Sequence, residues 1–92
     1  MSHEQVAQII YKEAKRVGYV VEQHKSGSTN SVYYTLHDGK FSLHFRVSDH
    51  ATNKNVITLR LDRNNSLDSA VKFVKNRIKD LATRELKLTL GL

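Results

Sequence analysis

The residues of this sequence that are best suited to chemistry lie on the polar side of a predicted β-sheet. In the segment 41–48, every second residue is apolar and the residues between them are polar. This alternation is typical of a half-buried strand with one face on a core and one face in solvent. The solvent side of this strand and its neighbours would carry Tyr33, His44, Arg46 and Arg60. Aromatic rings and Arg on a sheet can stack bases and contact phosphates; the alternative is an ordinary solvated face.

A second group of basic side chains falls at helical spacing near the C-terminus. Lys72, Lys75 and Lys79 are three or four residues apart, beside an apolar stripe. Such a row can follow the phosphates of a nucleic acid. The alternative is that these charges only keep this face of the helix solvated.

Two polar turns complete the candidate sites. The turn 25–30 contains Lys25 and Ser28, and its backbone amides and hydroxyls could hold a phosphate, although it lacks the pattern of a P-loop and also fits a hairpin loop. At the end of the strand 41–48, Ser48-Asp49-His50 contains a possible general acid/base pair. Adjacent strand residues point to opposite faces, so Ser48 and His50 are a better pair for catalysis than Asp49 and His50. The alternative is a turn cap, in which Asp49 accepts local backbone amides.

Composition narrows the kind of protein and of partner. The 92 residues are enough for one domain, 1–92, and the formal net charge of +6 favours a polyanionic partner, although it could also serve solubility alone. The whole excess of positive charge lies from residue 40 onward. The chain has no Cys, no apolar run of transmembrane length and no signal-peptide region at its start. We therefore expect a cytoplasmic protein without a membrane association.

A metal site or a cofactor is not expected from this sequence. His37 and His44 flank the turn Asp38-Gly39 and could face each other across a hairpin. Two imidazoles supply only half of a tetrahedral zinc site, and no Cys completes it.

The elements that must position these residues follow from the hydrophobic periodicity. We expect helices over 2–17 and from 66 to about 84, and strands over 19–24, 31–37, 41–48 and 56–61. Ser2 and Gln5 form a possible capping box, Gly18 is a natural C-cap, and Ser66 is a plausible N-cap. This order predicts an α+β two-layer sandwich, α-β-β-β-β-α, with an antiparallel meander sheet and both helices on one face.

The last eight residues, 85–92, switch to an alternation of period two. They could add a strand to a sheet edge, in this chain or in a partner. A frayed tail that lies on the core is the alternative.

The element order, together with Gly18-Tyr19 after the first helix and Gly27-Ser28 before the second strand, resembles the HicA-like toxins, which share the topology of the double-stranded RNA-binding domain. His50 matches the His that commonly ends the third strand of that family. Thr29 stands where the family has the His tied to ribonuclease activity. The resemblance therefore implies the fold without the usual catalytic residue. The aromatic strand followed by Arg-Val-Ser-Asp-His also resembles small proteins of phages and mobile elements.

These observations lead to a hypothesis of a small, non-catalytic nucleic-acid-binding domain, monomeric or homodimeric, that binds RNA or DNA. The residues expected to contact the nucleic acid are Lys25, Ser28, Tyr33, His44, Arg46, His50, Arg60, Lys72, Lys75 and Lys79. A second hypothesis is a phage or mobile-element protein that binds and modulates a host protein, for which the segment 86–92 would be the contact. The third is a HicA-like ribonuclease that uses His50.

Overall fold

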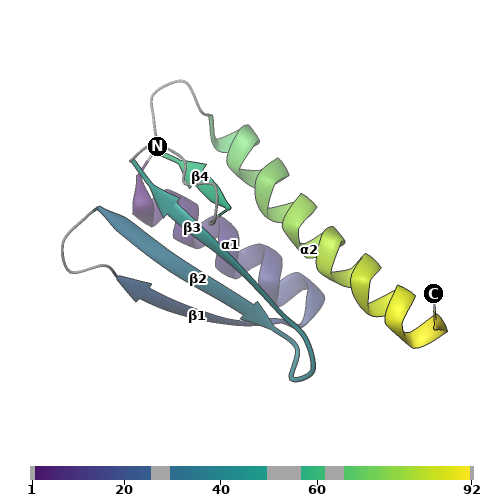
Figure 1. The fold of residues 1–92 in the computed structure, drawn as a ribbon. Coiled ribbons are helices and arrows are strands. Elements are labelled where there is room, and N and C mark those ends of the chain that lie inside the picture. The colour runs from purple at the N-terminus through teal and green to yellow at the C-terminus, as the bar shows by residue number, and fades with distance from the viewer. Residues whose placement is uncertain (1, 26–29, 50–56, 62–65, 92) are drawn as a thin grey trace.

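Two helices and a four-stranded sheet form the computed structural model, which describes residues 2–25, 30–49, 57–61 and 66–91 (Figure 1). Along the chain the elements are α1 (His3–Val17), β1 (Val20–Lys25), β2 (Ser31–His37), β3 (Ser42–Ser48), β4 (Thr58–Arg60) and α2 (Leu67–Leu90). The predicted α+β class and the predicted element order are confirmed.

Local signals in the sequence determine where both helices begin. At α1, the backbone N–H of Gln5 donates to Ser2 Oγ (3.2 Å) and the N–H of Ser2 donates to Gln5 Oε1 (2.9 Å), which completes the predicted capping box. Gly18 ends α1 with a φ of 79°, in the left-handed region that glycine adopts without strain. At α2, the N–H of Ser69 donates to Ser66 Oγ (3.2 Å), as expected for an N-cap.

The sheet has the strand order β1-β2-β3-β4 and is mixed. β1, β2 and β3 are antiparallel neighbours, but β4 runs parallel to β3, with Arg46 opposite Thr58 and Ser48 opposite Arg60. The prediction of a wholly antiparallel meander was therefore wrong. Residues 49–57 separate the two strands, which is more than the two residues of a tight hairpin, so the spacing in the sequence does not require an antiparallel turn.

Both helices pack against the same face of the sheet. α1 contributes Val6, Ile10 and Ala14 to the core, and α2 contributes Ala70, Val74, Ile78 and Leu81. Alternate residues of the strands complete the same cluster: Val32, Tyr34, Leu36, Leu43, Phe45, Val47 and Leu59. Figure 1 shows the sheet in front of α1, with α2 beside the β3–β4 side. The opposite face of the sheet is free of helices among the described residues.

Helix α2 continues well beyond the predicted end near residue 84. Residues 85–90 belong to it, so the prediction of an extra strand or a loose tail was wrong for them. The chain has no helix-breaking Gly or Pro between Leu67 and Leu90, and Glu, Leu and Lys favour helix. Gly91, with a φ of 73°, ends the helix by donating its N–H to the Leu88 carbonyl (3.3 Å).

The short strand β4 covers only the last part of the β3 edge, and α2 covers the next part. Arg77 of α2 donates from one terminal nitrogen to the His44 carbonyl (3.3 Å). Its other terminal nitrogen lies 3.5 Å from Asp80. Because an unpaired strand edge invites association with other chains, this Arg protects β3 where β4 is missing.

Candidate nucleic-acid interface

The face of the sheet turned away from the helices, here called the open face, carries its side chains in rows across the strands. Since Val32 and Tyr34 of β2 are buried in the core, their neighbours Tyr33 and Thr35 point to the other side. The register aligns one such row across all four strands: His24, Tyr33, Arg46 and Thr58. A second row joins Glu22, Thr35 and His44. Three planar side chains therefore stand side by side in the first row.

The rings on the open face differ in how they are held. Tyr33 is 39% exposed, and His24 and His44 are also exposed. Nδ1 of His44 lies 3.0 Å from Thr35 Oγ1 and hydrogen-bonds with it, which fixes the orientation of that imidazole. The exposed rings surround the position of Arg46, because His44 is the next residue of β3 on this face.

Arg46 lies on the predicted face but is only 9% exposed, whereas the sequence suggested a solvent-exposed group. Tyr33 on one side and Thr58 on the other flank it in the sheet. Its Nε donates to Thr58 Oγ1 (3.2 Å). The guanidinium group is therefore a positively charged support for the open face, and direct contact with a ligand falls to its exposed neighbours.

At the ends of β2 and β3 the polar groups bond to one another. Ser31 Oγ and Ser48 Oγ are 2.7 Å apart and both residues are buried. Asp49 accepts a hydrogen bond from the side-chain amide of Asn30 (3.1 Å), and the Asn30 carbonyl lies 3.1 Å from His3 Nε2 of α1. These contacts give Ser48 and Asp49 a structural role at the strand ends. His50 and Ser28 lie outside the described residues.

The other predicted contact residues lie at several separate places. Lys25 is on the helix-facing side of β1, where it lines a small recess with His3 and Glu4. Arg60 is on the open face, next to Ser48 in the register. The open face therefore brings together Tyr33, His44, Arg46 and Arg60, and does not include Lys25.

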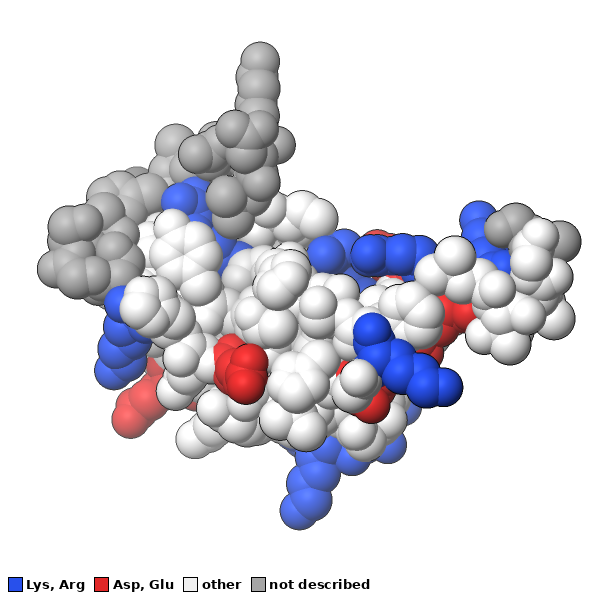
Figure 2. All heavy atoms as spheres, turned by 60° about the horizontal axis from the view of Figure 1, so that its bottom comes forward, with Lys and Arg blue, Asp and Glu red and all other residues white. Residues whose placement is uncertain are grey.

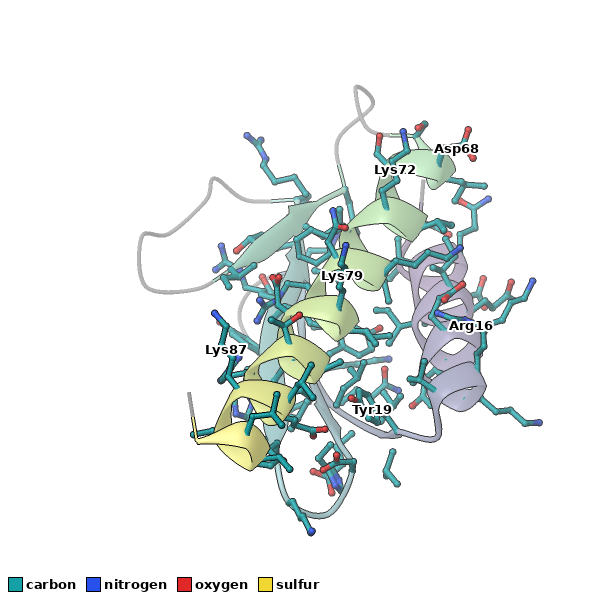
Figure 3. The ribbon with its side chains drawn as sticks, turned by 90° about the vertical axis from the view of Figure 1, so that its right-hand side faces the viewer. Arg16, Tyr19, Asp68, Lys72, Lys79 and Lys87 are labelled. Atoms are coloured by element: carbon teal, nitrogen blue, oxygen red, sulfur yellow. The ribbon has the colours of Figure 1, made fainter. Side chains whose placement is uncertain are left out.

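The lysines of α2 form a second surface that points in another direction. Val74, Ile78 and Leu81 of α2 face the core, so Lys72 and Lys79 lie on the opposite side of the helix. Figure 3 shows Lys72 and Lys79 projecting together from different turns of α2. Figure 2 shows cationic side chains scattered around a largely uncharged face, without one continuous basic patch. A short ligand lying flat on the open face cannot also contact Lys72 and Lys79.

Sequence reasoning did not find His24 as a member of the site. Its position beside Tyr33 depends on the pairing register of β1 and β2, which the turn 25–30 does not determine. Its place two residues after Glu22, and therefore on the same side of the strand, was the available signal.

The predicted hairpin pairing of His37 and His44 is absent. His37 is opposite Ser42, and its Nε2 lies 3.7 Å from Glu22. His44 is opposite Thr35. In the described part of the chain, no group of three or more His, Cys, Asp or Glu side chains could hold a metal ion.

A recess of about 540 Å³ separates the β2–β3 turn from the C-terminal part of α2 and is lined by Asp38, Lys40, Phe41, Glu85, Leu88 and Thr89. A hydrogen bond from the Glu85 carboxyl lowers the pKa of Asp38 to about 2, helped by the backbone N–H groups of Phe41 and Lys40, each 3.0 Å from Asp38 Oδ1. The same hydrogen bond, followed by partial burial, raises the pKa of Glu85. The interaction of the two carboxyl groups therefore favours a protonated Glu85 beside an ionised Asp38.

The raised pKa of Glu85, which lies beside Asp38 in the recess, predicts a pH-dependent attachment of α2 to the turn. Because the pKa of Glu85 is raised in the folded protein, protonated Glu85 stabilises the fold at pH values below its ordinary pKa. This stabilisation is lost as the pH rises through the pKa that Glu85 has in the folded protein. Glu85→Gln keeps a hydrogen-bond donor at every pH, so we expect it to raise the melting temperature relative to the unmodified protein more at neutral pH than at about pH 4. An equal shift at both pH values, or the same pH dependence in an Asp38→Asn background, would contradict this interaction of Glu85 with Asp38.

Among the helices that the structure describes, neither has the length and apolar character needed to cross a membrane. Comparison of the chain with models of protein families, with curated proteins and with solved structures finds no match. The resemblance to HicA-like toxins stays a prediction from the sequence.

Proposed function

We propose that this protein is a small, non-catalytic nucleic-acid-binding domain whose principal contact surface is the open face of the sheet. The observation that carries the proposal is the cross-strand row His24–Tyr33–Arg46, in which two exposed rings stand on neighbouring strands and the ring of Tyr33 adjoins the guanidinium group of Arg46. Planar side chains stack on bases, and a basic surface attracts the phosphate backbone. The net charge of +6 also attracts a nucleic acid over long range.

The contacts at the strand ends favour binding over catalysis. Ser48 is bonded to Ser31, and Asp49 accepts from Asn30, so both residues are part of the framework that holds β2 to β3. A general base must reach the proton that it removes. The buried position of Ser48 gives a substrate no direct access to it.

The lysines of α2 have a secondary role in this proposal. Lys72, Lys75 and Lys79 are exposed on a surface that points away from the core. They raise the local concentration of a polyanion around the domain without fixing its position.

The proposal predicts binding that weakens with salt. With about two phosphates contacted on a face of this size, the affinity for a fluorescent oligonucleotide should fall about tenfold between about 50 mM and about 200 mM salt, because each contact releases counterions. Fluorescence anisotropy with single-stranded and double-stranded RNA and DNA measures this directly. Lack of binding to any of these polymers at the lower salt would refute the proposal, since phosphate contacts are strongest there.

A second candidate function is the binding of a host protein, of phage or mobile-element type, through the end of α2. Leu86, Leu88 and Leu90 are 59%, 59% and 61% exposed there. Leu86 and Leu90 are about one turn apart and share a side of the helix, and an exposed apolar surface of this kind is typical of protein contacts. A protein that binds no nucleic acid at low salt would favour this second function.

A further inference from the structure

The open face selects unpaired nucleotides, we infer, and the ring of Tyr33 is the platform on which a base stacks. This inference rests on the proposed function and specifies its ligand as single-stranded RNA or DNA. It is carried by the position and exposure of three rings: Tyr33 at 39% exposure, with His24 directly opposite on β1 and His44 diagonally opposite on β3.

The arrangement of these rings matches the surface of a base and not that of a duplex. In a duplex the bases are stacked on one another and present only their edges, so a side chain on a flat sheet cannot reach their faces. An unpaired base can lie against an aromatic ring, and this stacking tolerates any sequence because every base has a π-face. A ring that is held in the middle strands of a sheet loses little freedom when a base binds.

The surroundings of Tyr33 fix the platform in place. The neighbouring Arg46 is held by Thr58, and His44 is held by Thr35, at 3.2 Å and 3.0 Å respectively. On the core side of β2, Val32 and Tyr34 anchor the strand on both sides of Tyr33. The ring therefore stands on a rigid element between groups that are already oriented.

The lysines of α2 do not extend the open face into one track that a duplex could follow. Lys72 and Lys79 lie on the far side of α2 from the core, whereas Tyr33 lies on the far side of the sheet. A duplex is stiff over about 150 base pairs and can contact only one of these surfaces.

The test compares one labelled strand of about eight nucleotides with the same strand annealed to its complement, as RNA and as DNA, at moderate salt. We expect the single strand to bind at least about tenfold more tightly than the duplex. Replacing Tyr33 with Ala should weaken single-strand binding about 5- to 150-fold, the loss of one stacked base, and Tyr33→Phe should bind like the unmodified protein. The RNA and DNA arms show which backbone is preferred.

The matched control is Tyr11→Ala, which removes an exposed tyrosine (45%) from α1, outside the open face. It should leave the affinity unchanged. Circular dichroism verifies that each variant is folded. Equal or tighter binding of the duplex, or an unchanged affinity in Tyr33→Ala, overturns the inference. If the binding still weakens with salt in that case, the proposed function stands without the preference for single strands. Lack of binding to either form at low salt overturns both.

Discussion

Replacing Phe45 with Ala should lower the free energy of unfolding by about 3–5 kcal/mol, the largest effect on stability that we expect from one substitution in this chain. Phe45 is 1% exposed in the centre of β3. Its ring is stacked with Tyr34 of β2, with ring centroids 5.6 Å apart, and meets the edge of Phe73 of α2 at 5.5 Å. The substitution removes the contact that joins the middle strands to the second helix and leaves a cavity.

The size of this effect is large relative to the whole stability of a small domain, which is about 5–15 kcal/mol. Urea denaturation followed by circular dichroism measures it as a lower midpoint with an unchanged slope. Tyr11→Ala is the control: this ring is 45% exposed on α1, and we expect a change within about 0.5 kcal/mol. A loss below about 1 kcal/mol for Phe45→Ala would mean that the aromatic cluster does not hold the two layers together.

Features that depend on neighbouring residues alone were predictable from the sequence. The capping box of Ser2 and Gln5, the N-cap Ser66 and the C-cap Gly18 each work within a single turn of chain, and all three are present. The alternation in β2 and β3 likewise predicted which side of each strand is buried. These signals are strong because each side chain acts on its own segment.

Features that depend on distant contacts were not predictable. The parallel direction of β4 appears only in its pairing with β3, and no local pattern encodes it. In the segment 85–90, alternating Leu residues suggested a strand, but three apolar residues over this length do not separate a period of 2 from one of 3.6. Glu85 and Leu88 continue the helix instead, next to the β2–β3 turn.

The candidate site was predictable in its residue types and less so in its geometry. Alternation placed Tyr33, His44 and Arg46 on one face, as the register confirms. The hydrogen bond of Arg46 to Thr58 was not predictable, because the sequence did not reveal the pairing of β4 with β3. The place of His24 in the row follows from the β1–β2 register.

Two double variants that introduce negative charge separate the open face from the outer side of α2. His24→Glu with His44→Glu puts two carboxylates around Tyr33 and lowers the formal net charge of +6 by two. Lys72→Glu with Lys79→Glu changes the second surface and lowers the charge by four. If the position of a charge matters more than the total net charge, the open-face variant should lose more affinity than the α2 variant, although it changes the net charge less.

We expect the open-face variant to lose more affinity than the α2 variant because electrostatic repulsion acts only over a short range in salt. A carboxylate beside a stacked base repels the adjacent phosphates at close contact, where screening by salt is weakest. At physiological salt the screening length is about 8 Å, so a charge on the far side of α2 has little effect on a ligand at the open face. We therefore predict a loss of at least about tenfold for the open-face variant and less than about threefold for the α2 variant.

The most direct test of the nucleic-acid interface is the ratio of the two dissociation constants. It is measured by anisotropy with one labelled single strand at about 150 mM salt, on variants whose circular dichroism and melting temperature match those of the unmodified protein. We predict that the open-face variant binds several times more weakly than the α2 variant. A greater loss in the α2 variant would place the ligand on that helix, and losses that follow the change in net charge alone would show that the row His24–Tyr33–Arg46 is not a binding site.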